Sequence, residues 1–178
     1  MSRFYVVLVC LLLLVSGFAY SQDAPRAEVF GGYQYLHVGD SGINFNLNGW
    51  NAAVNGYFNR YVGVTGDFSG TYGTPKFLGV GLSTKVYTYM FGPVVRFPNH
   101  STITPFAHAL FGGARATGSA FGVSASDNAF AWAAGGGVDA KVAPHVSIRV
   151  GQFDFLQSRF ASTHQNNFRY SGGVVFHF

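Results

Sequence analysis

Alternation of apolar with small or polar residues recurs from residue 27 to the C-terminus, and this pattern limits the fold more than any other feature of the sequence. Within residues 61–72, for example, one face reads VVGFGY and the other reads YGTDST. Successive side chains of a β-strand point to opposite faces, so a two-residue period predicts strands. No segment of this region sustains the 3.6-residue period of an amphipathic helix. We therefore expect an all-β fold.

Eight segments carry this alternation, and the connections between them differ in length. The segments are 27–38, 47–58, 61–72, 85–97, 103–116, 128–142, 146–156 and 167–178. The short connections are 59–60, 98–102 and 143–145, and the longer ones, rich in Gly, Ser and Asn, are 39–46, 73–84, 117–127 and 157–166. Eight strands with short turns at one end and long loops at the other are typical of outer-membrane barrels. We expect an eight-stranded antiparallel up-and-down transmembrane barrel with both termini on the short-turn, periplasmic side.

Composition helps to decide which face of such a barrel meets lipid. A soluble barrel of the lipocalin type has the same strand number but keeps its apolar residues inside. Here only 10% of the 178 residues are charged and 17% are aromatic, which leaves little polar surface for water. Aromatic residues crowd strand ends, as at 87–89 and 176–178, where interfacial girdles are expected. These features favour lipid outside and small polar residues in the lumen.

The N-terminal region predicts export. Arg3 precedes twelve residues, Phe4 to Val15, that form an apolar run, and small residues follow up to Ser21. This pattern predicts a signal peptide over residues 1–21 and a mature barrel domain over 22–178. The alternative, a transmembrane anchor, needs roughly 20 apolar residues. The only cysteine, Cys10, lies in this segment, so no disulfide is expected, and the protein should reach a bacterial outer membrane through the periplasm.

Charged residues inside the expected barrel form the first candidate site. They are Glu28, Asp67, Arg96, Asp139, Lys141, Arg149, Asp154 and Arg169. Buried charges have to be paired, so we expect a barrel-interior ion network. Strand direction puts five of the eight in the periplasmic half and sets Asp154 opposite Arg169 nearer the outside. Asp154 shares the face of Arg149 only if a bulge near Gly151 shifts the alternation by one residue.

Catalytic, metal and cofactor sites are not indicated. Of the six histidines, five lie at loop edges, in short turns or beside the C-terminus, and only His108 lies well inside an expected strand. No Ser-His-acid set or closely spaced pair of metal ligands is visible. We expect no catalytic, cofactor-binding or metal-binding residues. The net charge of +4 is scattered and includes no basic run, which argues against nucleic acid as a partner.

Five stretches of the sequence carry a resemblance to a known family. They are GWNAAVNGYFNRYVGVTGDFSG, TYMFGPVVRF, TPFAHALFGGARA, VSIRVGQFDF and FRYSGGVVFHF. Together they resemble the small outer-membrane β-barrel family, the OmpA-like or opacity-protein-like domains of Gram-negative-type bacteria. The resemblance spans residues 27–178 and implies a barrel in outer-membrane lipid. The chain ends at Phe178, so the peptidoglycan-binding domain that follows the barrel in OmpA is not expected.

The last eight residues resemble the assembly signal of this family, in which a polar residue, a Gly two places on and two hydrophobic residues lead to a terminal aromatic. The residues that match this pattern are Ser171, Gly173, Phe176 and Phe178. The resemblance implies that the barrel-assembly machinery is a partner of this strand. Alternation would direct Phe176 and Phe178 to lipid and Ser171 and Gly173 to the lumen.

The family implies more than one function. Its members include adhesins and lipid-interacting proteins, so we expect a structural or surface-binding role through the extracellular loops, with an unknown extracellular ligand. The alternative is a small-solute diffusion channel, although eight strands leave a lumen that side chains just fill. A third alternative is a lipid-modifying outer-membrane enzyme.

Overall fold

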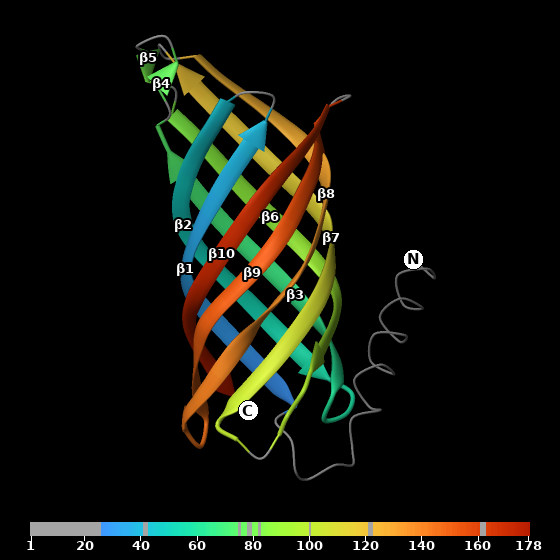
Figure 1. Cartoon of the computed structure of the whole chain (residues 1–178). Coiled ribbons are helices and arrows are strands. Elements are labelled where there is room, and N and C mark those ends of the chain that lie inside the picture. The colour runs from blue at the N-terminus through green and yellow to red at the C-terminus, as the bar shows by residue number, and fades with distance from the viewer. Residues whose placement is uncertain are drawn as a thin grey trace, which may run out of the picture.

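A closed barrel of eight long antiparallel strands makes up most of this computed structural model (Figure 1). The described residues are 26–40, 43–74, 76–77, 80–81, 83–99, 101–120, 123–160 and 163–178, and the predicted signal peptide lies outside them. The strands are β1 (Ala27–Asp40), β2 (Ile43–Tyr57), β3 (Val62–Gly73), β6 (Ser83–Arg96), β7 (Ile103–Ala120), β8 (Val123–Ala143), β9 (Val146–Phe160) and β10 (Thr163–His177). Each pairs with its neighbours in sequence, and β10 closes on β1, which confirms the predicted fold class.

A small hairpin of β4 (Lys76–Phe77) and β5 (Val80–Gly81) is inserted between β3 and β6. It lies at the end of the barrel opposite the C-terminus (Figure 1). No helix among the described residues has both the length and the apolar character that a membrane span requires.

The predicted strand ends agree with the structure at the short-turn end of the barrel but not at the opposite end. At the short-turn end every strand begins or ends within one residue of its predicted position. At the other end the strands run further, so that most of the predicted loops 117–127 and 157–166 belong to β7, β8, β9 and β10. Main-chain pairing continues beyond the apolar belt, where both faces of a strand meet water and the hydrophobic alternation stops. The expected long loops are therefore corrected to long hairpins.

The strands place apolar side chains on the outside of the barrel and polar side chains inside, the reverse of a water-soluble barrel. On β3, Val64 is 48% and Phe68 40% exposed, whereas Thr65 and Asp67 between them are only 5% and 2% exposed. Large apolar side chains point outward on all eight long strands. An apolar outside and a polar inside suit a barrel surrounded by lipid.

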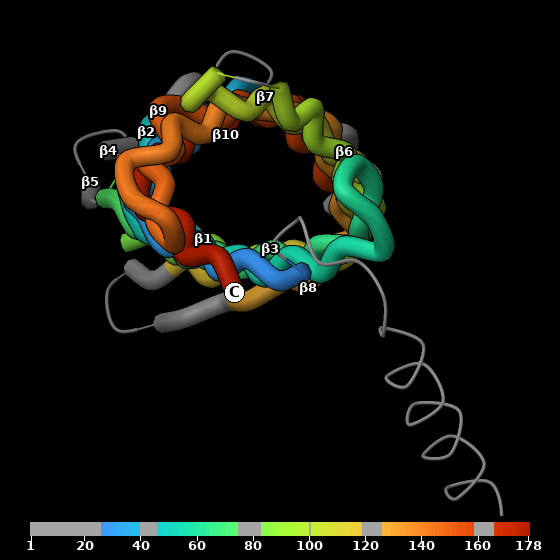
Figure 2. Tube along the Cα trace, turned by 90° about the horizontal axis from the view of Figure 1, so that it is seen from below, coloured from blue at the N-terminus to red at the C-terminus, as the bar shows by residue number. Residues whose placement is uncertain are grey.

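The strand register advances around the barrel, which is seen end-on in Figure 2. The path of paired residues runs through Val29, Val54, Gly66, Phe91, Phe111, Trp132, Gln157, Asn166 and Gly39. It returns to β1 ten residues beyond its start, and such a stagger requires tilted strands. Rows of neighbouring residues therefore climb toward the long-hairpin end as they pass from β1 through β2 to β10.

A β-bulge interrupts the lower half of β9. Val138 pairs with Gly151 and Asp139 with Arg149, so Val150 is an extra residue. The Tyr170 hydroxyl donates a 3.1 Å hydrogen bond to the Val150 carbonyl, which satisfies a backbone group that faces lipid. A side chain at Gly151 would press on the Tyr170 ring, since an added Cβ would lie 3.2 Å from it.

Candidate functional site in the barrel lumen

Arg169 is the centre of the ion network in the middle of the lumen. Its Nε donates to Asp154 Oδ2 over 2.7 Å and its Nη1 to Asp67 Oδ1 over 2.6 Å, and the guanidinium is fully buried. Asn51 Nδ2 donates to the other oxygen of Asp67 over 3.0 Å. His108 Nε2 lies 2.7 Å from Asp154 Oδ1. One cation from β10 thus links carboxylates on β9 and β3 across the lumen.

A second arginine extends this network toward the short-turn end. Arg149 donates from Nε and Nη2 to both carboxylate oxygens of Asp139, over 2.8 and 3.0 Å. Its Nη1 donates to Gln152 Oε1 over 2.7 Å, and Gln152 Nε2 donates to Asp154 Oδ2 over 2.8 Å. The bulge in β9 is what puts Arg149 and Asp154 on the same face. The result is one hydrogen-bonded chain from Asp139 to Asp67, which we call the charged chain.

A separate cluster lies at the short-turn end of the lumen. Arg96 Nη1 donates to Glu28 Oε1 over 2.7 Å, and Asn55 and the Tyr57 hydroxyl donate to Glu28 Oε2 over 3.1 and 2.9 Å. The Arg96 guanidinium also lies 3.8 Å from the centre of the Tyr57 ring. His177 Nδ1 is 3.3 Å from Glu28 Oε1, a close contact without hydrogen-bond geometry. Glu28 is therefore surrounded by donors and a cation.

Aromatic rings and a glycine provide room for these charges. The Arg149 guanidinium lies 4.4 Å from the ring centre of Phe30 and 4.0 Å from that of Phe106. Such stacking stabilises a cation that has lost its water. A side chain at Gly135 would overlap the Asp154 carboxylate and the Phe153 carbonyl. Glycine at this position lets the carboxylate approach the wall of β8.

The structure brings together seven of the eight charged residues named from the sequence, in two separate groups. The exception is Lys141, which is exposed at the short-turn rim. Within the described ranges no carboxylate lies at ion-pair distance from it. Its place near the short-turn end of β8 lets the ammonium reach water, which is cheaper than burial. The expectation that Lys141 belongs to the interior network is therefore wrong.

Sequence reasoning missed the neutral partners of the charged residues and the contact between His108 and Asp154. Gln152 and Asn51 connect charged groups that do not touch one another. His108 shares its parity with Phe106 and Leu110, both buried in the lumen, and this parity is compatible with a barrel-interior or a girdle position. No signal in the sequence pointed to Asp154 as its partner, because the two residues lie 46 positions apart.

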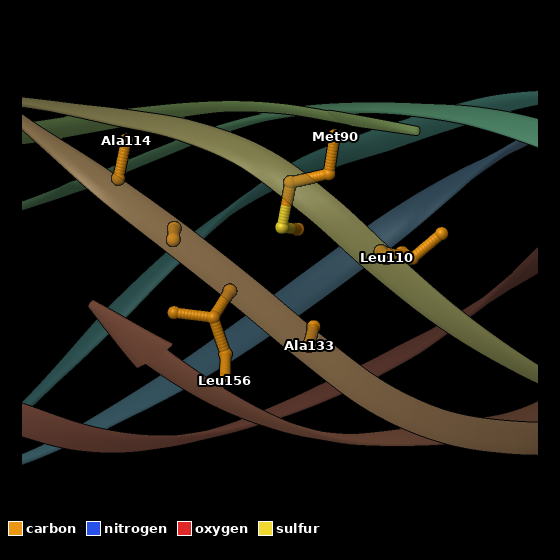
Figure 3. Packing of buried hydrophobic residues seen from close by; sticks show 6 residues of the cluster. Met90, Leu110, Ala114, Ala133 and Leu156 are labelled. Carbon is orange, nitrogen blue, oxygen red and sulfur yellow. The ribbon is translucent and has the colours of Figure 1, made fainter. Parts of the chain in front are cut away.

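Apolar side chains fill the lumen beside the charged chain. Met90, Leu110, Ala114, Ala131, Ala133 and Leu156 form a cluster in which no residue is more than 3% exposed (Figure 3). It lies along β6, β7, β8 and β9. We call it the apolar cluster. Among the described residues no three His, Cys, Asp or Glu side chains gather as metal ligands.

The closing strand β10 has the expected arrangement of faces. Ser171 is fully buried, whereas Phe176 and Phe178 are 48% and 72% exposed on the outside. Gly173 packs against the β1 backbone at Gly31, where an added Cβ would overlap the carbonyl. Phe178 N donates to the Ala27 carbonyl over 2.9 Å, so pairing with β1 continues to the last residue.

Comparison with solved structures finds the same architecture in small outer-membrane barrels. Neisserial surface protein A has a TM-score of 0.71 at 15% identity, over 88% of this chain and 100% of that chain. Ail, the attachment invasion locus protein of Yersinia pestis, has a TM-score of 0.61 at 22% identity, over 86% and 99%. The N-terminal barrel of Pseudomonas aeruginosa OprF has a TM-score of 0.57 at 9% identity, over 88% and 100%. These likenesses concern the fold alone.

Comparison with curated proteins finds no significant match. A family model for the outer membrane protein β-barrel domain, however, matches residues 7–178. This match agrees with the closed barrel, its apolar outer face and its charged lumen. The chain therefore belongs to the outer membrane protein β-barrel domain family and is a protein of the bacterial outer membrane.

Proposed function

We propose that this protein binds a partner at the cell surface through the hairpins at its long-hairpin end, and that the barrel is a closed support without catalytic activity or a cofactor. The observation that carries this proposal is the filled lumen. The charged chain and the apolar cluster occupy the space that a diffusion channel would need. An eight-stranded barrel is narrow enough for side chains to close it in this way.

The hairpin of β7 and β8 is the best candidate for the binding element. These strands have 18 and 21 residues, whereas a tilted strand crosses the membrane with ~9–11. Their mutual pairing extends to Ala120 and Val123, while the described pairing of β8 with β9 starts at Phe130 and Arg159. Residues 123–129 therefore have only β7 as a described neighbour. Main-chain groups at such an edge can pair with an extended segment of a partner.

Conductance across a planar bilayer tests whether the lumen is closed. The purified full-length protein should give no steady single-channel steps, with a large porin as the positive control for insertion. Steady steps would replace the surface-binding proposal with the channel alternative.

Heparin binding tests the role of the hairpin. Heparin is a suitable probe because Ail, which shares the fold, was crystallised with the heparin analogue sucrose octasulfate. One variant replaces residues 118–125 by Asn-Gly, which joins the paired residues Thr117 and Ser126 by a two-residue turn. The matched control replaces residues 160–163 in the same way between the paired residues Arg159 and His164, so that neither variant removes a basic residue. We expect binding to be lost only in the first variant. Equal binding by both would exclude the β7–β8 hairpin, and no binding by the unaltered protein would exclude sulfated polysaccharides as partners.

We also propose that the protein is exported through the periplasm and that β10 carries the signal read by the barrel-assembly machinery. Before closure, the free edge of β10 would offer main-chain groups for strand addition. Deletion of Phe178 should reduce the amount in the outer membrane and leave degraded periplasmic material. Phe97→Ala is the matched control, because Phe97 is an exposed aromatic at the same end of the barrel. Equal outer-membrane yields of the two variants would refute a special role for Phe178.

A further inference from the structure

A cavity of about 830 Å³ opens at the short-turn end of the barrel, the end that faces the viewer in Figure 2. We call it the vestibule. Its walls come from the turns and from the lower ends of the strands, and they include the hydroxyls of Ser101, Thr102, Thr104 and Ser147. Polar and apolar atoms line the vestibule in similar measure, and it lies at the opposite end from the proposed surface-binding hairpins.

The charges around the vestibule do not balance. Its two internal carboxylates, Glu28 and Asp139, are each bound by a buried arginine that donates over 2.7–2.8 Å. In a count of the lining charges the Arg26 side chain offsets the Phe178 carboxylate, and the Arg26 backbone N–H donates to the Phe178 oxygen over 3.0 Å. These pairs leave the remaining cations of the rim in excess.

Those cations are Arg60 and Lys141, both exposed. In the part of the chain that the structure describes, neither has a carboxylate within 4.0 Å. Arg60 belongs to the β2–β3 turn and Lys141 to β8, and three strands separate β2 from β8 on one side of the ring and three on the other. The two residues therefore line the vestibule from opposite sides of its rim, and the Arg60 guanidinium lies 5.2 Å from the centre of the Tyr61 ring.

Cross-turn hydrogen bonds hold this rim in place. Arg96 Nε donates to the Arg60 carbonyl over 3.0 Å, and Lys141 N donates to the Thr102 carbonyl over 2.7 Å. His177 N donates to the His145 carbonyl over 2.9 Å, which fixes the turn after β8. A ligand would find the rim already formed, so binding would lose little free energy to ordering of the backbone.

We propose that the vestibule binds a phosphate-bearing anion between Arg60 and Lys141, with the hydroxyls of Thr102 and Thr104 as additional donors. The Ser101 hydroxyl already donates to Asn99 Oδ1 over 2.7 Å, and the Ser147 hydroxyl is hydrogen-bonded to His177. Phosphate suits this site because several acceptor oxygens can be shared among a guanidinium, an ammonium and hydroxyls at once. A carboxylate has only two oxygens and would leave donors on one side unused. The phosphate could belong to a free phosphate compound of the periplasm or to a phospholipid headgroup of the surrounding leaflet.

Calorimetric titration with pyrophosphate tests the proposal. The full-length protein is folded in a phosphate-free maltoside detergent, and we expect saturable binding. Arg60→Gln and Lys141→Gln should each weaken binding about tenfold or more, since a hydrogen bond to a charged group is worth ~1.5–3 kcal/mol. The matched control is Lys85→Gln, which removes an exposed positive charge at the long-hairpin end. Absence of saturable binding, or equal weakening in Lys85→Gln, would overturn the proposal.

Two further arms identify the source of the phosphate and guard against misfolding. Dihexanoyl phosphatidylglycerol below its micellar concentration is titrated in the same detergent. Competition between this lipid and pyrophosphate would assign the site to headgroup phosphates, whereas binding of pyrophosphate alone would assign it to free phosphate compounds. Both rim variants should keep the heat-modifiable gel migration of the folded barrel, because neither side chain contributes to the buried network. The result is independent of heparin binding and conductance, so it can fail or succeed separately from the proposed function.

Discussion

The charged chain and the apolar cluster fill neighbouring parts of one lumen, yet they depend on their members in different ways. In the charged chain each group is held by directional contacts, and the central Arg169 binds carboxylates from two strands. In the apolar cluster no contact is directional, and each side chain contributes in proportion to the surface it buries. Removing one charge leaves its former partners buried and unpaired, whereas removing one apolar side chain leaves only a cavity. The comparison predicts an order of effects.

Arg169→Ala should have the largest effect. It leaves both Asp67 and Asp154 without their cation in a buried site, and loss of one partner from a buried pair typically costs ~3–5 kcal/mol. We expect a loss of free energy of unfolding at the upper end of this range, measured by guanidinium titration in lipid vesicles. If Arg169→Ala lost no more free energy of unfolding than a truncation in the apolar cluster, the charged chain and the apolar cluster would not differ in this respect.

Arg149→Ala and Asp139→Ala should each cost about 3 kcal/mol, because each leaves one buried partner unpaired. The double variant should cost less than the sum of the two, since no charge of this pair is then left alone. The same unfolding titration measures the coupling energy. Additive losses would show that the two residues act independently in spite of their bidentate contact.

Leu156→Ala should cost ~2–3 kcal/mol, which is the usual effect of a truncation in a core that collapses partly around the cavity. Leu156 is 3% exposed and packs in the apolar cluster. Leu156→Met, which nearly conserves volume, should cost less than ~1.5 kcal/mol. If the methionine variant were as unstable as the alanine variant, shape and not volume would govern this part of the lumen.

Lys141→Ala should have the smallest effect, within ~0.5 kcal/mol of the unaltered protein, because the side chain is exposed. It serves as the reference for the charged chain, since it removes a charge from the same strand as Asp139. A loss of more than about 1 kcal/mol in the free energy of unfolding would show that Lys141 contributes to the interior network in spite of its exposure.

The sequence predicted which face each residue takes but not which partner it meets. Alternation placed Asp154 and Arg169 inside and opposite each other, and the required bulge lies at Val150 beside the expected position. Arg169 also reaches Asp67, which lies 102 positions earlier in the sequence. Such a contact depends on the stagger of the whole barrel, to which every strand pair contributes, and no single segment records it.

The sequence was also limited in predicting where the strands end. Near the short turns, proline and charged residues stop the pattern abruptly, as at Pro98 and Pro144, and the strand ends were predicted well. Near the long hairpins, main-chain pairing continues through polar residues that carry no alternating signal. Backbone hydrogen bonds there are satisfied between strands whatever the side chains are, so hydropathy could not locate the ends of β7 and β8.

The bulge at Val150 also determines how this chain can tolerate insertion and deletion. Deleting Val150 would restore a regular ladder but would turn residues 146–149 to the opposite face, so that Ile148 would enter the lumen and Arg149 would meet lipid. Arginine on the lipid face of a barrel costs up to ~2–4 kcal/mol at the bilayer midplane and less toward the interface. A relative that lacks the extra residue must therefore carry the inverse polarity pattern in this short segment. The amino-acid sequence of such a relative would therefore show that the bulge is lost, because apolar and polar positions would be exchanged just before the deletion.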